Sequence, residues 1–315
     1  MKKVLTMTLN PCIDRTVYFD SFCVGETNIV KKVLEEAAGK GINVAVGLRH
    51  LDIPVKALGF AYKEDLSKLY GKLEEEGIPH AFVEVDGRLR VNQKLFDESK
   101  SEMTECNEKG CEVSKENVDK LLELLQEELK DASILVLSGS VPPGVNVDIY
   151  ARMTSMANEA GVKVILDASG ELLCEGVKSK PYLIKPNKDE FEKTFLRDKE
   201  EKRLDESRNI QDEKTDFEGE LQYIAEKLLM DGVSYICLSM GGDGARMISL
   251  ADGKLVVDNR LAIQVQVRSL QGAGDAMVAG LCKAIYEEQE NKMLDYALLM
   301  AASTISLEGT QMGRV

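Results

Sequence analysis

The sequence predicts an α/β fold in which helices cover a mostly parallel β-sheet. Short apolar runs alternate along the chain with longer helical patterns, and small or polar residues follow each run. The clearest runs are residues 134–137, 162–166, 182–184 and 235–238. Repeated strand–loop–helix units are typical of parallel sheets, whose ligands bind at the carboxyl ends of the strands. The length of 315 residues, without a visible internal repeat, suits a single domain over 1–315.

The first strands and helices are predicted from apolar periodicity and from the residues that begin and end helices. Residues 3–9 are apolar enough for a first strand, and residues 41–51 place apolar side chains at helical spacing. A buried strand is predicted over 55–59 and an amphipathic helix over 63–77, which ends at a glycine. A serine precedes the helix predicted over 115–129 and is a good N-cap for it.

Two segments break this rhythm with short alternating strands and turns. They cover about 14–36 and 83–103, and their clearest strands are 16–19 and 90–96. We expect them to form a small separate sheet that acts as a lid over one end of the core. Residues 197–220 are densely charged with few apolar anchors, and we interpret them as a solvated insertion of unassigned role.

Composition limits the classes of function. The formal net charge is −14, which disfavours binding to nucleic acids or anionic membranes but permits local anion sites. No apolar stretch is long enough for a membrane span, and polar residues interrupt the apolar start that could suggest a signal peptide. The seven cysteines are scattered and odd in number, as expected for reduced thiols. We therefore expect a cytoplasmic protein.

The strongest chemical signal is the run Gly272-Ala273-Gly274-Asp275, which leads directly into a helical pattern. Glycines let the backbone approach an anion closely, and a helix N-terminus offers unpaired N–H groups and the positive end of a dipole. A carboxylate beside such an anion hole can take the proton from a hydroxyl that attacks a phosphoryl group. The alternative is that Asp275 is only a helix-capping residue.

Other nucleotide-binding motifs do not fit. The segment Gly39-Lys40-Gly41 lacks the Ser or Thr and the earlier glycine of a P-loop. Met277 stands where a dinucleotide fingerprint after Gly272 needs a glycine, and the motifs of protein kinases are missing.

Taken together, the motifs resemble those of the ribokinase/PfkB family of carbohydrate kinases. Residues 272–275 and 38–45 are similar to the family's two signatures, and further segments resemble the branch that contains 1-phosphofructokinase and tagatose-6-phosphate kinase. These segments occur in the same order over nearly the whole chain, at 8–14, 137–144, 165–170, 185–190 and 238–241. The resemblance implies a ribokinase-like three-layer α/β sandwich with a β lid, and a phosphotransferase that uses ATP and Mg²⁺.

The resemblance also implies roles for matching residues. Asp14 would hydrogen-bond sugar hydroxyls, Arg90 would reach from the lid to the existing phosphate of the sugar, and Ser138 would line the same pocket. The groups that would hold the sugar and its phosphate at the start of the first helix are Gly39, Lys40 and Asn43. In the motif at 272–275, Gly272, Ala273 and Gly274 would form the anion hole and Asp275 would be the catalytic base.

On the nucleotide side, the resemblance implies that Lys185 and Asn187 face the ATP phosphates. Asn187 and Glu190 would position Mg²⁺, and the nucleotide would be bordered by Ser239, Gly241 and Gly244. Each role has a structural alternative: Asp14, Ser138 and Ser239 could be turn residues, Lys40 a solvated residue at a helix start, and Glu190 a first-turn acid. Arg90 could instead pair with Asp86 or Glu84.

The chain departs from the family pattern at three places. Ala37-Ala38 replaces a glycine near the sugar site, Gln271 replaces a small apolar residue or Thr, and Ser303 stands where an Asn often borders the adenine.

The sequence therefore predicts a kinase that transfers the γ-phosphoryl group of ATP to a ketohexose phosphate. The preferred acceptor is fructose 1-phosphate, which would give fructose 1,6-bisphosphate, and tagatose 6-phosphate is the next choice. The alternatives are a kinase for an unphosphorylated sugar or nucleoside and a sugar-phosphate-binding regulator without catalysis. We further expect a homodimer formed through the lid, because a sheet this small leaves an apolar face to cover.

Overall fold

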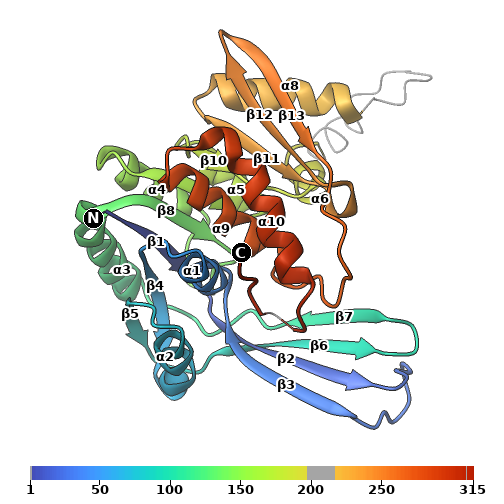
Figure 1. Cartoon of the computed structure of the whole chain (residues 1–315). Helices are drawn as coiled ribbons and strands as arrows, with labels where there is room; N and C mark the ends of the chain where they lie inside the picture. The colour runs from blue at the N-terminus through green and yellow to red at the C-terminus, as the bar shows by residue number, and fades with distance from the viewer. Residues whose placement is uncertain (1, 197–216, 310) are drawn as a thin grey trace, which may run out of the picture.

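The computed structural model describes residues 2–196, 217–309 and 311–315, and two sheets organise it (Figure 1). The larger sheet has nine strands in the order β13-β12-β11-β10-β9-β8-β1-β4-β5. Neighbours from β11 to β5 run parallel, whereas β12 and β13 are antiparallel additions at one edge. The strands are β1 (Lys3–Thr8), β4 (Val55–Tyr62), β5 (His80–Val85), β8 (Ala132–Ser138), β9 (Lys163–Asp167), β10 (Leu183–Ile184), β11 (Tyr235–Ser239), β12 (Ala245–Ala251) and β13 (Lys254–Arg260).

Helices cover both faces of the larger sheet (Figure 1). On one face α1 packs against α9, and α9 packs against α10, while α3, α4 and α5 pack on the other. The helices are α1 (Lys40–His50), α2 (Leu66–Glu75), α3 (Lys115–Glu128), α4 (Ile149–Glu159), α5 (Gly170–Val177), α6 (Lys188–Phe191), α8 (Phe217–Met230), α9 (Ala273–Tyr286) and α10 (Met293–Ile305). The predicted α/β class with a mostly parallel sheet is confirmed.

Burial on both faces explains the composition of the central strands. In β8, the run Ile134–Leu137 is fully buried between the two helical layers, as near-continuous apolar strands of parallel sheets are. Glycines allow the helices to come close: a Cβ at Gly41 of α1 would lie 2.4 Å from the carbonyl oxygen of Met7 in β1. A Cβ at Gly280 of α9 would lie 2.4 Å from the carbonyl oxygen of Tyr296 in α10. This packing fixes the N-termini of α1 and α9 above the sheet.

The second sheet has four strands in the order β3-β2-β6-β7 and is called the small sheet below. Its strands are β2 (Cys12–Phe19), β3 (Lys32–Ala38), β6 (Arg90–Asp97) and β7 (Glu102–Asn107). It projects from the body of the molecule, and one end lies beside the carboxyl ends of the larger sheet (Figure 1). Because β2 leaves β1 directly and β3 leads into α1, the small sheet is tied to the core where a ligand would bind.

The small sheet was predicted, but its boundaries differ from the predicted ones. Residues 83–85 do not belong to it: they complete β5, which pairs in parallel with β4 of the larger sheet. The second half of the small sheet therefore runs from 90 to 107 rather than from 83 to 103. Its first half runs from 12 to 38 rather than from 14 to 36. The charged segment at 197–216 lies outside the described residues, and 217–220 begin α8.

Local predictions were accurate for the early helices and strands. The first strand covers Lys3–Thr8, and α1 lies within one residue of the predicted 41–51 at each end. The predicted helix at 63–77 is shorter, because Lys63–Asp65 form a 3₁₀ turn before α2. At α3 the Oγ of Ser114 accepts a hydrogen bond from the backbone N–H of Asn117 at 3.3 Å, so the predicted N-cap is confirmed.

Candidate active site

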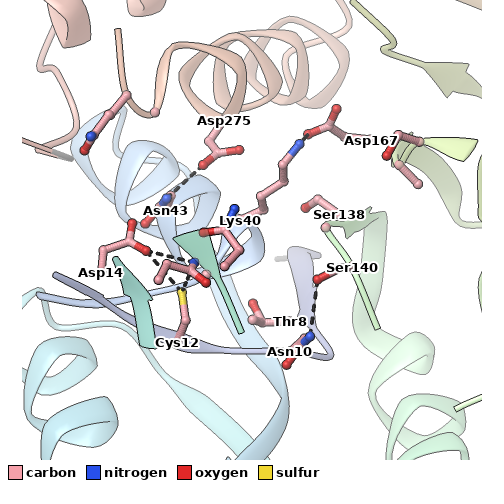
Figure 2. A pocket seen from close by; sticks show the side chains of 18 of the residues that line it. Thr8, Asn10, Cys12, Asp14, Lys40, Asn43, Ser138, Ser140, Asp167 and Asp275 are labelled. Atoms are coloured by element: carbon pink, nitrogen blue, oxygen red, sulfur yellow. Dashed lines mark hydrogen bonds and ion pairs between the residues drawn. The ribbon is translucent and has the colours of Figure 1, made fainter. Parts of the chain in front are cut away.

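A cavity of about 390 Å³ lies where the carboxyl ends of β1, β8 and β9 meet the N-termini of α1 and α9. One end of the small sheet forms its opposite wall. Figure 2 shows polar side chains from all these elements converging on it. The cavity collects these predicted residues: Asp14, Gly39, Lys40, Asn43, Arg90, Ser138, Glu190, Gly272 and Asp275. We call it the acceptor cavity.

Asp275 lies at the N-terminus of α9 and faces the acceptor cavity. Gly272 is the N-cap with a φ of 74°, a left-handed conformation that favours glycine. The first intrahelical bond runs from the N–H of Ala276 to the carbonyl of Gly272, so the N–H groups of Ala273 and Gly274 lack partners inside the helix. Asp275 is buried and accepts a 2.8 Å hydrogen bond from Nδ2 of Asn43 (Figure 2).

The environment of Asp275 suits a proton acceptor. Burial raises the pKa of its carboxyl to about 6, and the Lys40 ammonium opposes that rise. A base whose pKa lies just below neutrality is ionised at working pH and still accepts a proton readily. Beside it, the N-terminus of α9 offers N–H groups without partners inside the helix, and Gly272 and Gly274 lie in this first turn.

Lys40 and Lys185 are linked through a residue that sequence reasoning did not assign to the site. Asp167, at the end of β9, is 3.2 Å from Nζ of Lys40 and 3.0 Å from Nζ of Lys185. Burial opposes ionisation of Asp167, but the two ammonium groups outweigh it and hold the pKa of the carboxyl below its usual value. In turn, Asp167 raises the pKa of Lys40. Its position at a strand's carboxyl end was the signal that could have identified it.

Asp14 comes from β2 of the small sheet; Cys12 of the same strand donates to it at 3.4 Å, and its closer partners are residues of β6. Nζ of Lys94 is 2.7 Å from one carboxylate oxygen, and Nδ2 of Asn92 donates to the other at 3.1 Å. Lys94 also donates to Oε1 of Gln271 at 3.1 Å. Sequence reasoning missed both Asn92 and Lys94. The signal was their alternation with Arg90 along one strand, which puts all three on the same face.

Arg90 reaches the far end of the acceptor cavity. Its guanidinium donates to the backbone carbonyls of Asn10 at 3.2 Å and Glu108 at 3.0 Å. Glu84 accepts from Tyr70, and Asp86 pairs with Lys63, so the alternative pairing of Arg90 with those acids is wrong.

Gly39 and Ser138 lie near the carboxyl end of β1. A Cβ at Gly39 would come within 2.6 Å of Cγ2 of Thr8, so only glycine fits there. The Oγ of Ser138 is buried without a hydrogen-bond partner and lines the cavity, which leaves it available to a ligand.

A second, more open hollow of about 750 Å³ follows the carboxyl end of β11. Three residues predicted to lie near the nucleotide line it, Asn187, Ser239 and Gly241, and we call it the donor groove. Gly244 is not among its lining residues. With a φ of 97° and a prospective Cβ contact of 2.0 Å to the carbonyl of Arg260, Gly244 instead makes the turn between β11 and β12 possible. Ser303 also lies elsewhere, donating to the carbonyl of Arg314 at 3.0 Å.

Asn187 and Glu190 form a capping box at the start of α6. Oδ1 of Asn187 accepts from the N–H of Glu190 at 2.7 Å, and Oε2 of Glu190 accepts from the N–H of Asn187 at 2.9 Å. Among the described residues, no three His, Cys, Asp or Glu side chains gather into a metal group. The other carboxylate oxygen of Glu190, Oε1, takes no part in the capping box. Glu190 lines the acceptor cavity, whereas Asn187 lines the donor groove. This arrangement fits Mg²⁺ held mainly by phosphates and water, as that ion prefers.

The fold and this site define a class of protein: an α/β enzyme with a buried carboxylate beside a glycine-rich helix N-terminus that can stabilise a transferring phosphoryl group. The model of the pfkB family carbohydrate kinases matches residues 7–314. The chain belongs to this family, whose members transfer phosphate from ATP to a sugar hydroxyl. Within the described ranges, no helix is long and apolar enough to cross a membrane.

Curated relatives and solved structures agree with this membership. The chain is 30% identical to a 1-phosphofructokinase of Vibrio cholerae over 99% of its own length and 92% of the relative's. It is 32% identical to a 1-phosphofructokinase of Bacillus subtilis, over 90% and 86%. A structure of phosphofructokinase-2 from Escherichia coli with substrates and products matches with a TM-score of 0.84 at 24% identity, over 99% and 95%. Ribokinase from Thermotoga maritima matches with a TM-score of 0.74 at 17% identity, over 98% and 95%. The predicted ribokinase-like fold is confirmed.

Proposed function

We propose that the protein transfers the γ-phosphoryl group of ATP to a hydroxyl of a ketohexose phosphate, with fructose 1-phosphate as acceptor and fructose 1,6-bisphosphate as product. The observation that carries this proposal is Asp275. It is a buried carboxylate with a pKa raised to about 6, at a glycine-capped helix N-terminus, on the wall of a cavity of sugar-phosphate size. The 1-phosphofructokinases among the relatives support the choice of acceptor.

The polarity of the acceptor cavity supports a phosphorylated sugar. Lys40 and Lys94 each have a carboxylate partner within the protein, but Arg90 donates only to carbonyl oxygens in the hydrogen bonds described above. A guanidinium without a carboxylate partner is suited to a phosphate, which it can bind through two parallel hydrogen bonds. We propose that Arg90, together with Lys40, binds the existing phosphate of the sugar, and that Gly39 and Ser138 line the adjoining wall.

The orientation of the sugar follows from the two ends of the cavity. Asp14, held by Lys94 and Asn92, is placed to accept hydrogen bonds from sugar hydroxyls. Asn43 holds the Asp275 carboxylate, which takes the proton of the attacking hydroxyl. With the phosphate at Arg90 and a hydroxyl at Asp275, the sugar would span the acceptor cavity and present that hydroxyl to the N-terminus of α9.

On the donor side, we propose that ATP lies in the donor groove with its adenosine part along Ser239 and Gly241 and its phosphates toward Asn187. Lys185 is buried beside Asp167, and a Cβ at Gly274 would be 3.5 Å from Nζ of Lys185. The positive charge of Lys185 would therefore help to stabilise an anion at the N-terminus of α9. The N–H groups of Gly272, Ala273 and Gly274 would stabilise charge that develops on the transferred group. Mg²⁺, bridging phosphate oxygens near Glu190 and Asn187, would offset phosphate charge.

A coupled assay of ADP release against a panel of ketohexose phosphates tests this function. The panel includes fructose 1-phosphate, tagatose 6-phosphate and fructose 6-phosphate, with free fructose and a nucleoside as unphosphorylated acceptors. We expect the highest kcat/KM with fructose 1-phosphate and little turnover with unphosphorylated acceptors. Preference for a neutral acceptor would contradict the role of Arg90. Binding of sugar phosphate without ADP release from any acceptor would indicate a non-catalytic regulator.

We also propose that two chains pair through their small sheets. Several apolar side chains on and beside these strands are exposed, which is unfavourable in water; they are Val24, Ile29, Val30, Val33 and Met103. Similarity to the family implies that such lids clasp face to face. Pairing would cover the apolar surface and help to keep water from the acceptor cavity, where water would compete with the sugar hydroxyl.

A further inference from the structure

A buried lysine connects the small sheet to the turn that forms the anion hole. Lys94 of β6 is 6% exposed, and its Nζ contacts Oδ2 of Asp14 at 2.7 Å and Oε1 of Gln271 at 3.1 Å. Asp14 and Lys94 belong to the small sheet, whereas Gln271 directly precedes Gly272, the N-cap of α9. One ammonium group therefore touches both the carboxylate proposed to bind the sugar and the turn proposed to bind the transferring phosphoryl.

Lys94 and Arg90 contact different groups: Lys94 pairs with Asp14, whereas Arg90 donates to two backbone carbonyls. The two residues are four positions apart on one face of β6, which separates them by about 13 Å at the usual rise of a strand. Lys94 is also already neutralised by Asp14 in a buried pair. A buried ion pair with a third, neutral partner is better suited to holding groups in place than to capturing a second anion.

The connection depends on the length and the amide oxygen of the Gln271 side chain. A small apolar residue or Thr at this position, as in the family pattern, could not reach Lys94 with a side-chain acceptor. Gln271 is partly buried and lines the acceptor cavity, and its own N–H donates to Oγ of Ser269 at 3.2 Å. Both the backbone N–H and the side-chain oxygen of Gln271 are therefore hydrogen-bonded. Because of these two bonds, we expect a displacement of Lys94 to displace the backbone of the turn before α9.

We propose that Lys94 and Gln271 form a latch that couples occupation of the sugar site to assembly of the anion hole. A sugar that engages Asp14 fixes Lys94, Lys94 fixes Gln271, and Gln271 sets the backbone of Gly272 at the start of α9. Lys94 and Gln271 are positioning residues in this role: they act through Asp14 and through the turn. The inference rests on the proposed function, because it takes Asp14 as the sugar-binding group and residues 272–274 as the anion hole.

The cleanest variant is Gln271→Met, because it removes the acceptor at similar side-chain length and leaves the Lys94–Asp14 pair intact. We expect kcat with saturating sugar phosphate to fall roughly 10-fold, the size expected for losing a hydrogen bond to a charged group. The KM for ATP should stay within about 2-fold, since binding outside the transferring phosphoryl is unchanged. Gln264→Met is the matched control: Gln264 is an exposed residue of the same extended segment, and kcat should not change.

A double-mutant cycle shows whether the two side chains act together. Lys94→Met leaves Asp14 buried without its ion-pair partner and will lower kcat/KM strongly by itself. If the latch exists, adding Gln271→Met to Lys94→Met lowers kcat by less than about 2-fold, because the contact is already lost. A further loss of roughly 10-fold, equal to the effect in the wild-type background, would overturn the latch.

Hydrogen–deuterium exchange tests the coupling without relying on activity or on the folding of the Lys94 variant. In the wild type, the best acceptor of the panel should slow exchange in peptides of β6 and in peptides covering the turn before α9. In Gln271→Met the same acceptor should protect β6 but not the turn, and Gln271→Glu, which retains an acceptor oxygen, should restore protection of the turn. Equal protection of the turn in the wild type and in Gln271→Met would overturn the proposal. Failure of the proposed function appears separately, as full activity in Asp275→Asn.

Discussion

The acceptor cavity and the donor groove are built in different ways. In the acceptor cavity, Asp275 is held by Asn43, 232 positions away, and Asp14 by Lys94, 80 positions away. These groups are buried and already paired. In the donor groove, the exposed Asn187 is satisfied by its own helix turn, where it forms a capping box with the half-buried Glu190 three positions later.

This difference indicates how strongly each site depends on single side chains. A buried, paired network in low dielectric loses much when one member is removed, because the remaining charge is left without its partner. An open groove that binds through backbone groups and local caps loses less from a single side chain. We therefore expect changes in the acceptor cavity to affect catalysis and choice of sugar strongly, and changes in the donor groove to have small effects.

The largest effect is expected for Asp275→Asn. The amide preserves the shape and the contact with Asn43, but it does not accept the proton, so kcat should fall by about 10²–10⁴-fold. Binding of ATP, measured by calorimetry, should be nearly unchanged. The control is Asp119→Asn, which removes an exposed carboxylate of α3 that lines neither the acceptor cavity nor the donor groove. More than a tenth of wild-type activity in Asp275→Asn would contradict its role as base.

Arg90→Ala should mainly weaken binding of the sugar phosphate. Loss of a charge-assisted contact costs about 1.5–3 kcal/mol, so the KM for the acceptor should rise by one to two orders of magnitude. Arg88→Ala is the control. Arg88 lies two positions before Arg90, pairs with Glu108 and does not line the cavity. An unchanged KM in Arg90→Ala would place the phosphate elsewhere.

Lys40→Ala distinguishes a phosphate ligand from a structural cation. It removes one of the two ammonium groups that hold Asp167, so we expect a lower melting temperature in addition to a higher KM for the acceptor. Arg90, which pairs with carbonyls only in the contacts described, should change KM with little effect on melting. Loss of stability without any change in KM would show that Lys40 serves only Asp167.

The small sheet should hold two chains together. We expect light scattering to give a dimer at micromolar concentration, and Val33→Glu, which puts a charge at an exposed apolar position of β3, to shift it toward monomer. The KM for the acceptor should rise several-fold as the cavity becomes more open. Lys32→Glu, at the neighbouring and more polar position, is the comparison variant. A wild type that is strictly monomeric and fully active would rule out the dimer.

The smallest effect is expected for Glu190→Gln, at the capping box between the acceptor cavity and the donor groove. Glutamine can preserve the capping box, so stability should change by less than about 0.5 kcal/mol. Removing the charge should raise the Mg²⁺ concentration needed for half-maximal activity only several-fold, because phosphates and water supply most ligands. A loss as large as that of Asp275→Asn would mean that the donor side also depends on a single side chain.

Sequence reasoning succeeded where the information is local. The GAGD turn, the cap at Ser114 and the position of Asn187 at the start of α6 all depend on residues within one helical turn. Local reasoning could not decide the role of Gly244, because a glycine that enables a strand turn and one that admits a phosphate look alike in sequence.

Sequence reasoning failed where the contact is long-range. Asp167 is joined to Lys40 across 127 positions, and Lys94 to Gln271 across 177. No spacing rule relates such residues until the order of the strands is known. The prediction of the lid boundary at 83 was wrong for a related reason. The alternation at 83–85 suits a strand of either sheet, and only the pairing with β4 assigns these residues to the larger sheet.

The pH dependence of kcat tests the role of Asp275 most directly. Because burial raises the pKa of this carboxyl to about 6, Asp275 is ionised and active above that pH and becomes protonated and inactive below it. With saturating ATP, Mg²⁺ and sugar phosphate, kcat should therefore be nearly constant above about pH 7 and then fall tenfold per pH unit well below pH 6. In Asp275→Asn the residual rate should lack this acid limb. A wild-type kcat that stays constant down to pH 5, or an acid limb that persists in Asp275→Asn, would contradict Asp275 as the base.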